Sequence, residues 1–406
     1  MICNSLCKKT EKGRIRMFKV TFKFGSGEDV TTFAQEGENL LEVARVTNVA
    51  IDAPCGGNAS CGKCKVKLVE GELHSPKTRH ISDEEYDEGW RLACVSKITG
   101  DVAVEVPDIA SAYRSRMKVA DLSSKKEIAI FEKAKNDLEE AGLTLKNSMG
   151  ILDVSMEVPS LDDTMPDNER FVRAIKKTTG ASKVRLPFQV LTKIARVFRE
   201  SNFEVRCVIR TSDEGDIFVY DVYPKSESVV IGGLAIDIGT TTVSALLINM
   251  LTGEIIGKAS AGNGQIRYGA DVINRIIESM KPGGSEKLQK AVIDETINPL
   301  IQQMCRANGF KPEHIYRMSI AANTTMNHLM AGMEGDPIRM EPYIPTYYKT
   351  NSLFASDIGI AINRDAHIII APNIGSYVGG DITAGALVSM LWNRPEFSLF
   401  IDLGTN

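Results

Sequence analysis

Four cysteines constrain the fold of this chain more than any other feature. Cys55, Cys61 and Cys64 lie in the stretch CGGNASCGKC, and Cys94 completes the spacing C-x5-C-x2-C-x29-C. Three thiols on one loop can meet a fourth from a distant segment only if the chain folds back on itself. The sequence therefore predicts a compact domain built around these four side chains.

This spacing is typical of the ligands of a 2Fe-2S cluster of the plant or adrenodoxin type. Gly56, Gly57 and Gly62 keep the loop clear of bulky side chains, so backbone N–H groups can surround a negatively charged cluster. A structural zinc site is the alternative, because Cys61 and Cys64 form a C-x2-C pair, although zinc ribbons usually use two such pairs. The x5 spacing departs from the plant-type x4, which leaves the potential of the cluster open.

The other four of the eight cysteines do not share this pattern. Cys207 lies in a strand-like run and Cys305 in a helical run, which indicates small buried side chains. Cys3 and Cys7 lie in the basic stretch 1–16, and we assign them no role. Residues 1–16 lack the apolar stretch of a secretory signal, so a disulfide scaffold is not expected.

The residues around the cysteine loop have the pattern of a small sheet. Alternating apolar residues predict a hairpin over 17–33, and helical spacing predicts a helix over 38–49. Strand-like runs follow at 63–73 and 101–107. This order resembles that of a ferredoxin-type β-grasp domain, which we expect over residues 17–108.

Length and composition limit the remaining possibilities. A chain of 406 residues is expected to form two to four domains. Its net charge of −4 and pI near 5.9 give no electrostatic footprint for nucleic acid. Apolar runs are interrupted well short of the roughly 20 residues of a membrane span. We therefore expect a cytoplasmic, multidomain α+β and α/β protein that binds neither nucleic acid nor membrane.

Two regions between the cysteines and the second half of the chain carry no catalytic pattern. Residues 109–147 are charged and helix-friendly, which predicts a helical linker. Residues 148–228 combine strand-like and helical runs and are expected to form a small mixed middle domain. We interpret this domain as a spacer or docking unit.

A glycine turn after an apolar strand is the second informative motif. In GLAIDIGTTT, Asp237 ends the strand, Gly239 allows a close backbone approach to phosphate, and Thr240 and Thr241 add hydroxyl donors. A carboxylate at Asp237 can hold the water shell of Mg²⁺. This hairpin resembles the first phosphate motif of the actin, sugar-kinase and Hsp70 ATPase superfamily, so residues 231–406 are expected to form an actin-like ATPase half-domain.

The stretch FIDLGTN at 400–406 repeats this pattern as an apolar strand followed by D-x-G-T. The resemblance makes Asp402, Gly404 and Thr405 the second phosphate clamp. Between the two motifs, Asn323 and Thr324 either line the nucleotide cleft or only cap a helix. Because the sequence ends inside the second turn, we expect a fragment or an interrupted reading frame that lacks the adenosine-binding part.

The combination of these motifs resembles the reductive activators of corrinoid proteins. It comprises the ferredoxin domain, the linker, the middle domain and an ATPase domain with DIGTTT, AANTTMNHL, PNIGSYVGGD and DLGTN. The resemblance implies ATP-dependent reduction of a corrinoid from Co(II) to Co(I), in the one-carbon metabolism of anaerobes. The implied cofactors are a 2Fe-2S cluster and Mg·ATP, and the cysteines would carry the electron.

The resemblance also implies partners. The corrinoid would belong to a partner protein of a methyltransferase system, because the five histidines of the chain lack a D-x-H-x-x-G context: His74, His80, His314, His328 and His367. A ferredoxin or flavodoxin would donate the electrons, and a homodimer is possible. Whether the chain is itself an enzyme stays open. The alternatives are a ferredoxin-type electron carrier with a non-catalytic ATPase-like docking domain, and a small-molecule kinase with an accessory cluster.

Overall fold

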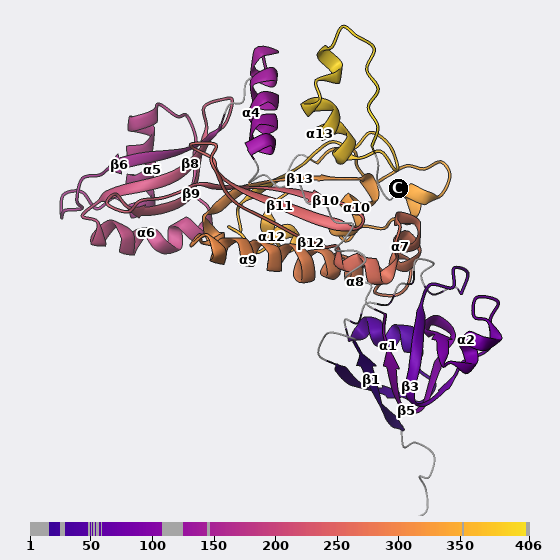
Figure 1. The fold of residues 1–406 in the computed structure, drawn as a ribbon. Helices are drawn as coiled ribbons and strands as arrows, with labels where there is room; N and C mark the ends of the chain where they lie inside the picture. Colours follow the sequence, from indigo (N-terminus) through magenta and orange to yellow (C-terminus); the bar gives the residue numbers. More distant parts are fainter. Residues whose placement is uncertain are drawn as a thin grey trace, which may run out of the picture. The chain divides into compact units, whose positions relative to one another are not determined.

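The structure is a computed structural model of the 406-residue chain. It describes residues 16–24, 29–47, 49, 51, 53, 57, 59–107, 125–143, 147–350 and 353–402. The chain divides into two compact units (Figure 1). The first contains residues up to 118 together with 264–284, and the second contains the rest.

The first unit is built on a five-stranded sheet in the order β2-β1-β5-β3-β4. Strand β1 runs parallel to β5, whereas β3 is antiparallel to β5, which is the arrangement of a β-grasp domain. Its elements are β1 (Met17–Lys23), β2 (Val30–Gln35), α1 (Leu40–Val46), β3 (Lys65–His74), α2 (Asp83–Asp87), β4 (Trp90–Leu92), η1 (Ala93–Val95) and β5 (Lys97–Glu105).

The core of this domain follows the sequence periodicity. Val20 and Phe22 of β1 are fully buried, and their polar neighbours face outward. In α1, Leu40, Leu41 and Ala44 form the buried face that packs on the sheet. The domain therefore has one sheet, one covering helix and one core, as the alternating pattern predicts.

Residues 147–228 form a four-stranded sheet in the order β6-β8-β9-β7 with two helices against it. The rings of Phe171 in α5 and Phe198 in α6 meet edge to face with centroids 5.1 Å apart. Helix α4 (Lys125–Glu140) precedes this sheet. The elements are β6 (Met149–Ser155), α5 (Asp167–Thr179), β7 (Val184–Arg185), α6 (Phe188–Glu200), β8 (Glu204–Thr211) and β9 (Ile217–Pro224).

The last part of the chain forms a five-stranded sheet in the order β12-β11-β10-β13-β14. The first three strands are an antiparallel meander, and β13 runs parallel to both β10 and β14. The strands are β10 (Gly232–Ile238), β11 (Thr242–Asn249), β12 (Ile255–Gly262), β13 (Ile315–Ala322) and β14 (His367–Ile370).

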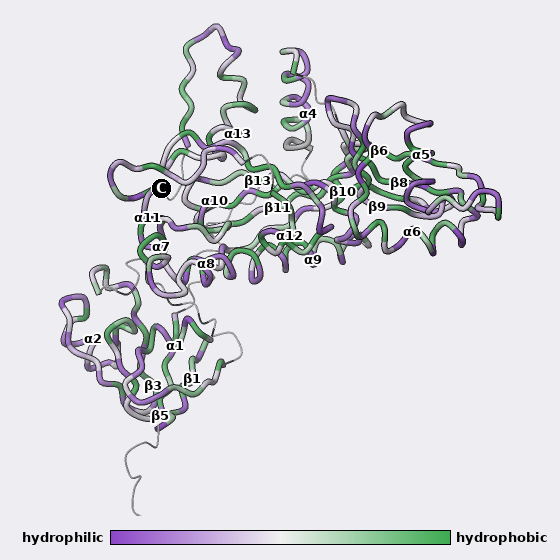
Figure 2. The backbone as a smooth tube through the Cα atoms, turned by 180° about the vertical axis from the view of Figure 1, so that it is seen from behind, coloured by the Kyte–Doolittle hydropathy of each residue, from purple (hydrophilic) through white to green (hydrophobic). Residues whose placement is uncertain are grey.

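Helices connect these strands along the chain. After β12 come η2 (Gly264–Tyr268), α7 (Val272–Ser279), α8 (Gly284–Val292), η3 (Ile293–Ile297), α9 (Asn298–Ala307) and η4 (Pro312–His314). After β13 come α10 (Thr324–Met330), α11 (Asp336–Arg339), α12 (Ala355–Ile358), α13 (Gly380–Val388) and η5 (Leu391–Asn393). Strand β13 is mostly hydrophobic in Figure 2, as expected for a strand inside a sheet. No helix in the described ranges is long and apolar enough to cross a membrane.

The sheet of β10 to β14, called the ATPase-like sheet below after the resemblance predicted from its sequence, shares a packed aromatic contact with the sheet of β6 to β9. The rings of Tyr220 and Tyr316 lie 5.8 Å apart, and both residues belong to one buried cluster. The hydroxyls of Tyr223 and Tyr316 are 2.8 Å apart, and Tyr223 donates to Asp221 over 2.8 Å. Lys193 of α6 also donates to the buried Asp221. Residues 148–228 are therefore docked on the ATPase-like sheet through β13.

The multidomain α+β fold class predicted from the sequence is confirmed, but one predicted strand is wrong. Residues 394–402, which contain the apolar run before Asp402, form no strand. Phe397 and Leu399 are highly exposed there. No neighbouring strand in the described ranges pairs with this segment, and an extended segment needs a hydrogen-bonded neighbour to be stable in water.

Candidate functional site

Two of the predicted cysteine ligands meet where β3 and β4 pair. Cys64 directly precedes β3 and Cys94 lies in η1 after β4, and the antiparallel pairing of Lys65 with Leu92 brings these ends together. The backbone N–H of Ala93 donates to the carbonyl of Cys64 over 2.9 Å. Both thiols are buried. Cys64 and Cys94, which are far apart in the sequence, are thus brought next to each other in the fold.

Cys61 lies on the same loop and is partly exposed. Cys55, the fourth predicted ligand, lies outside the described residues, as do Gly56, Cys3 and Cys7. In the part of the chain that the structure describes, no three His, Cys, Asp or Glu side chains are placed to hold a metal ion.

The glycines predicted to shape the loop have clear structural reasons. Gly57 adopts φ +100, and a methyl group on it would lie 3.4 Å from Leu41 and 3.9 Å from Cβ of Cys94. The loop therefore passes directly beside Cys94. Gly62 also adopts a left-handed φ of +67, where a side chain would be strained. Thiolate donors on a loop of this kind fit a 2Fe-2S cluster, which supplies one-electron transfer when bound.

Asn39 links helix α1 to the cysteines and was missed in the sequence analysis. Its Oδ1 accepts from the backbone N–H groups of Leu41 and Glu42, so it is the N-cap of α1. Its Nδ2 donates to the carbonyl of Cys94 over 2.8 Å. The preference for Asn at helix starts would have identified the cap but not the second contact.

The predicted nucleotide residues gather at one edge of the ATPase-like sheet. Strands β10 and β13 are parallel and pair Asp237 with Ala321, so the turns that follow them lie side by side. Nδ2 of Asn323 reaches Oγ1 of Thr240 over 3.5 Å, and both side chains are buried. Asn323 also caps α10 through its Oδ1. The fold thus brings the phosphate hairpin and Asn323 together.

Thr324 makes its hydrogen bonds within the protein. It is fully buried, and its hydroxyl donates to the carbonyls of Gly375 and Val378. These contacts tie the start of α10 to the loop before α13. The arrangement favours a structural role for Thr324 over contact with a ligand, while Asn323 is the residue that caps the helix.

Asn263 supports the phosphate hairpin and was also missed in the sequence analysis. Its Nδ2 donates to the carbonyl of Gly239 over 2.9 Å, and its backbone N–H donates to the carbonyl of Thr241 over 2.8 Å. The side chain is buried. No local motif marks this residue, because the contact depends on the pairing of β11 with β12.

Asp381 is a third carboxylate at this edge of the sheet, in addition to Asp237 and Asp402. A methyl group on Gly379 would lie 2.4 Å from the carbonyl oxygen of Ala322 and from Cα of Asn323. This close backbone approach places Asp381, in the first turn of α13, near the strand ends. The sequence analysis noted the glycine turn but not the carboxylate that follows it.

Two of the carboxylates at this edge have raised pKa values. Desolvation by the surrounding protein raises the pKa of Asp237 to about 6, although the side chain reaches solvent at the end of β10, and the negative charges of Asp381 and Asp402 contribute to this rise. Burial is also the main cause of the raised pKa of Asp381. Negative charge near Asp237 favours its protonated form, and a cation beside it would favour its ionised form. Gly404 and Thr405, the rest of the predicted second clamp, lie outside the described residues.

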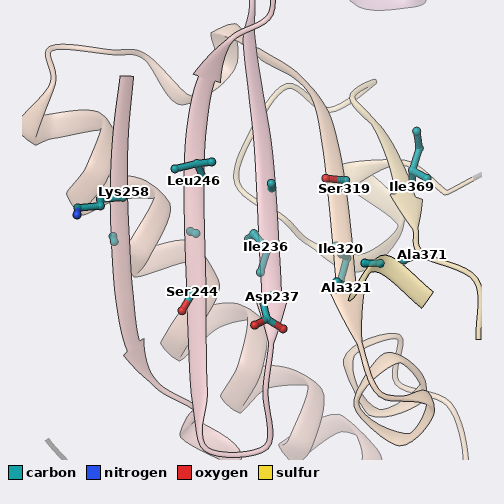
Figure 3. A pocket seen from close by; sticks show the side chains of 14 residues that line it. Ile236, Asp237, Ser244, Leu246, Lys258, Ser319, Ile320, Ala321, Ile369 and Ala371 are labelled. Carbon is teal, nitrogen blue, oxygen red and sulfur yellow. The ribbon is translucent and has the colours of Figure 1, made fainter. Parts of the chain in front are cut away.

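An apolar groove of about 440 Å³ lies along this sheet, with Ala384 of α13 also in its lining (Figure 3). Its floor includes small residues such as Ala235, Ser319 and Ala321. Asp237 lies at the end of β10 beside Ser244 of β11. The groove therefore opens onto the carboxylate edge and presents an apolar surface next to a charged one.

Three family models match successive parts of the chain. They are a 2Fe-2S iron-sulfur cluster binding domain over residues 24–99, the RACo linker region over 138–228 and the RACo middle region over 232–394. The solved structure of a reductive activator for a corrinoid, iron-sulfur protein covers 96% of this chain at 32% identity, with a TM-score of 0.56. The chain belongs to the reductive activators of corrinoid proteins.

This membership confirms the resemblance predicted from the motifs. The corrinoid activation enzyme RamQ of Eubacterium limosum is 26% identical over 375 residues, which is 91% of this chain. One component of the Na⁺-translocating NADH-quinone reductase of Chlamydia pneumoniae is 30% identical over 96 residues, which is 23% of this chain and 22% of that component. The chain spans 55% of RamQ and 60% of the solved activator.

Proposed function

We propose that this activator passes single electrons to the corrinoid of a partner protein and reduces it from Co(II) to Co(I). The supporting observation is the meeting of Cys64 and Cys94 beside the glycine loop of a ferredoxin domain, in a chain that also carries the RACo regions. Cys55, Cys61, Cys64 and Cys94 would hold the 2Fe-2S cluster. The protein would act in the cytoplasm and receive its electrons from a low-potential ferredoxin or flavodoxin.

We further propose that Mg·ATP binds at the carboxylate edge and drives this transfer. Asp237 and Asp381 would hold the water shell of Mg²⁺, which usually takes one or two protein carboxylates. Gly239, Thr240, Thr241 and Asn323 would contact phosphate, and Asp402, Gly404 and Thr405 would form the second clamp. Thr324 would act by fixing the start of α10.

ATP is needed because the electron transfer is uphill when the cobalt couple lies below its donor. Each ~59 mV of difference costs a factor of ten in the equilibrium of a one-electron transfer. Nucleotide binding can offset this cost only by favouring one conformation of the complex over another. The docking of residues 148–228 on β13 gives such a change a route from the nucleotide edge to a neighbouring domain.

We propose that each part of the chain has a separate role. Residues 17–108 carry the electron, 109–147 tether this domain, 148–228 dock, and 231–406 bind nucleotide. The ferredoxin-type alternative keeps electron transfer by residues 17–108 and removes nucleotide binding by residues 231–406. Comparing the rate of corrinoid reduction with and without ATP separates the two functions.

The deciding experiment uses anaerobically purified protein and a corrinoid protein in the Co(II) state. Reduced protein with Mg·ATP should restore the absorbance of Co(I), and protein without ATP should not. Equal reduction with and without ATP would support the simple electron carrier. One zinc per chain, with no acid-labile sulfide, would exclude both functions.

A further inference from the structure

His80 lies against the backbone of the cysteine loop. Gly62 lies between Cys61 and Cys64, and a methyl group added to it would be 2.5, 2.7 and 2.9 Å from Cβ, Cγ and Nδ1 of His80. No side chain other than the hydrogen atom of glycine fits there without moving the histidine. The imidazole therefore covers the peptide groups between two predicted ligands.

The hydrogen bonds of the ring indicate which nitrogen carries the proton. Nε of Arg79 donates to Nε2 of His80 over 3.4 Å. A neutral imidazole that accepts at Nε2 carries its proton on Nδ1. Nδ1 is also the ring nitrogen nearest to Gly62. Nδ1 therefore carries its hydrogen on the part of the ring that lies against Gly62.

Contacts on both sides hold the segment that carries His80. The next residue, Ile81, packs against the core of the ferredoxin domain. On the other side, the buried Ser75 accepts a hydrogen bond at its hydroxyl from Ser96 over 3.0 Å and at its carbonyl from Tyr86 over 2.9 Å. The position of the ring thus depends on the domain core as well as on its contact with the loop.

We propose that His80 is a positioning residue that sets the reduction potential of the bound cluster. This inference rests on the 2Fe-2S cluster of the proposed function. Hydrogen bonds toward the sulfurs and exposure to solvent are two main determinants of such potentials. A donor that faces the loop stabilises the more negative, reduced state. Removing the donor while keeping the ring should therefore make reduction harder.

Two substitutions separate the effect of the N–H donor of His80 from the effect of a ring lying over Gly62. His80→Phe keeps an aromatic ring over Gly62 but has no N–H, and His80→Asn restores a side-chain N–H close to the position of Nδ1. We expect His80→Phe to lower the equilibrium constant for one-electron reduction about tenfold, which is about 59 mV. His80→Asn should restore most of the equilibrium constant for reduction that His80→Phe loses. His74→Phe, at the end of β3, is the matched control and should leave the potential unchanged.

The potentials are measured on the full chain by anaerobic titration with dithionite at one fixed pH, followed by EPR. An unchanged potential in His80→Phe overturns the proposal, and so does a His80→Asn variant that shifts as far as His80→Phe. Iron and acid-labile sulfide are measured on every protein. A wild-type protein without them overturns the proposed function itself, so the two failures are distinguishable.

Discussion

The cysteine loop and the carboxylate edge are assembled in opposite ways. The contacts described above that fix the cysteines join residues between 39 and 96, within one small domain. The carboxylate edge instead collects Asp237, Asp381 and Asp402 from across the ATPase-like region. The first site depends on short connections, and the second depends on the order of the strands in a sheet.

The two sites also differ in charge balance. The N–H groups of Asn39 and Ala93 donate to the carbonyls of Cys94 and Cys64, so the backbone of these cysteines is held by neutral hydrogen bonds. Desolvation, with a smaller contribution from neighbouring negative charge, raises the pKa values of Asp237 and Asp381, and a cation beside them would favour their ionised forms. The comparison indicates that the cysteine loop is stabilised by its own domain, whereas the carboxylate edge needs its ligand.

The largest expected effect is on the cysteine loop. Cys64→Ser removes a buried thiolate ligand and should abolish the visible absorbance and the EPR signal of the cluster. Mg·ATP binding should persist, because the two sites are assembled from separate segments. Cys207→Ala, at a buried cysteine of β8, is the control and should keep the full cluster content. Normal cluster content in Cys64→Ser would contradict the ligand assignment.

The second largest expected effect is on Mg·ATP binding at the carboxylate edge. Asp237→Asn removes a proposed Mg²⁺ partner and should weaken Mg·ATP binding at least tenfold, about 1.4 kcal/mol, by calorimetry. Asp294→Asn, at an exposed carboxylate, is the control. Unchanged affinity in Asp237→Asn would show that the edge does not bind the metal.

The same variant tests the pH dependence of stability. The pKa of Asp237 rises from 3.8 to about 6 in the folded protein, so the folded state holds this proton more tightly than the unfolded state. Without Mg²⁺, the free energy of unfolding should therefore fall as pH rises from about 4 to 6. Asp237→Asn should lose this part of the decrease, which is measured by urea unfolding at several pH values. An identical pH profile in both proteins would contradict the raised pKa.

Asn263→Ala should have an intermediate effect on stability and on Mg·ATP binding. It leaves the partly buried carbonyl of Gly239 without its donor, and losing a buried hydrogen-bond partner typically costs about 1–3 kcal/mol at most in such a position. We expect lower stability in urea unfolding and weaker Mg·ATP binding, because the hairpin that approaches phosphate is loosened. The cluster should be unaffected. A loss of cluster in this variant would break the independence of the two sites.

Asn39→Ala is the matched change at the cysteine loop and should have the smallest effect. It removes the cap of α1 and the donor to Cys94, with an expected loss of about 1 kcal/mol. Faster release of iron to a chelator should accompany this loss, while Mg·ATP affinity stays at the wild-type value. Together the two asparagine variants test whether each site depends only on its own region.

The sequence by itself determined the features that depend on near neighbours. Alternation of Val20 and Phe22 with polar residues predicted β1, and the spacing of Cys61 and Cys64 predicted a ligand loop inside the span that the 2Fe-2S family model matches. Local order is sufficient here because strand alternation and cysteine spacing are fixed within a few residues. The strand predicted before Asp402 was wrong, because a strand also requires a neighbour to pair with.

Only the tertiary structure decided which distant residues support these motifs. Asn263 contacts Gly239 because β11 pairs with β12, and Asp381 reaches the edge because Gly379 lets two backbones approach closely. His80 meets Gly62 because the segment before α2 is anchored at Ser75. Such contacts depend on strand order and close backbone packing, which no spacing in a single sequence records.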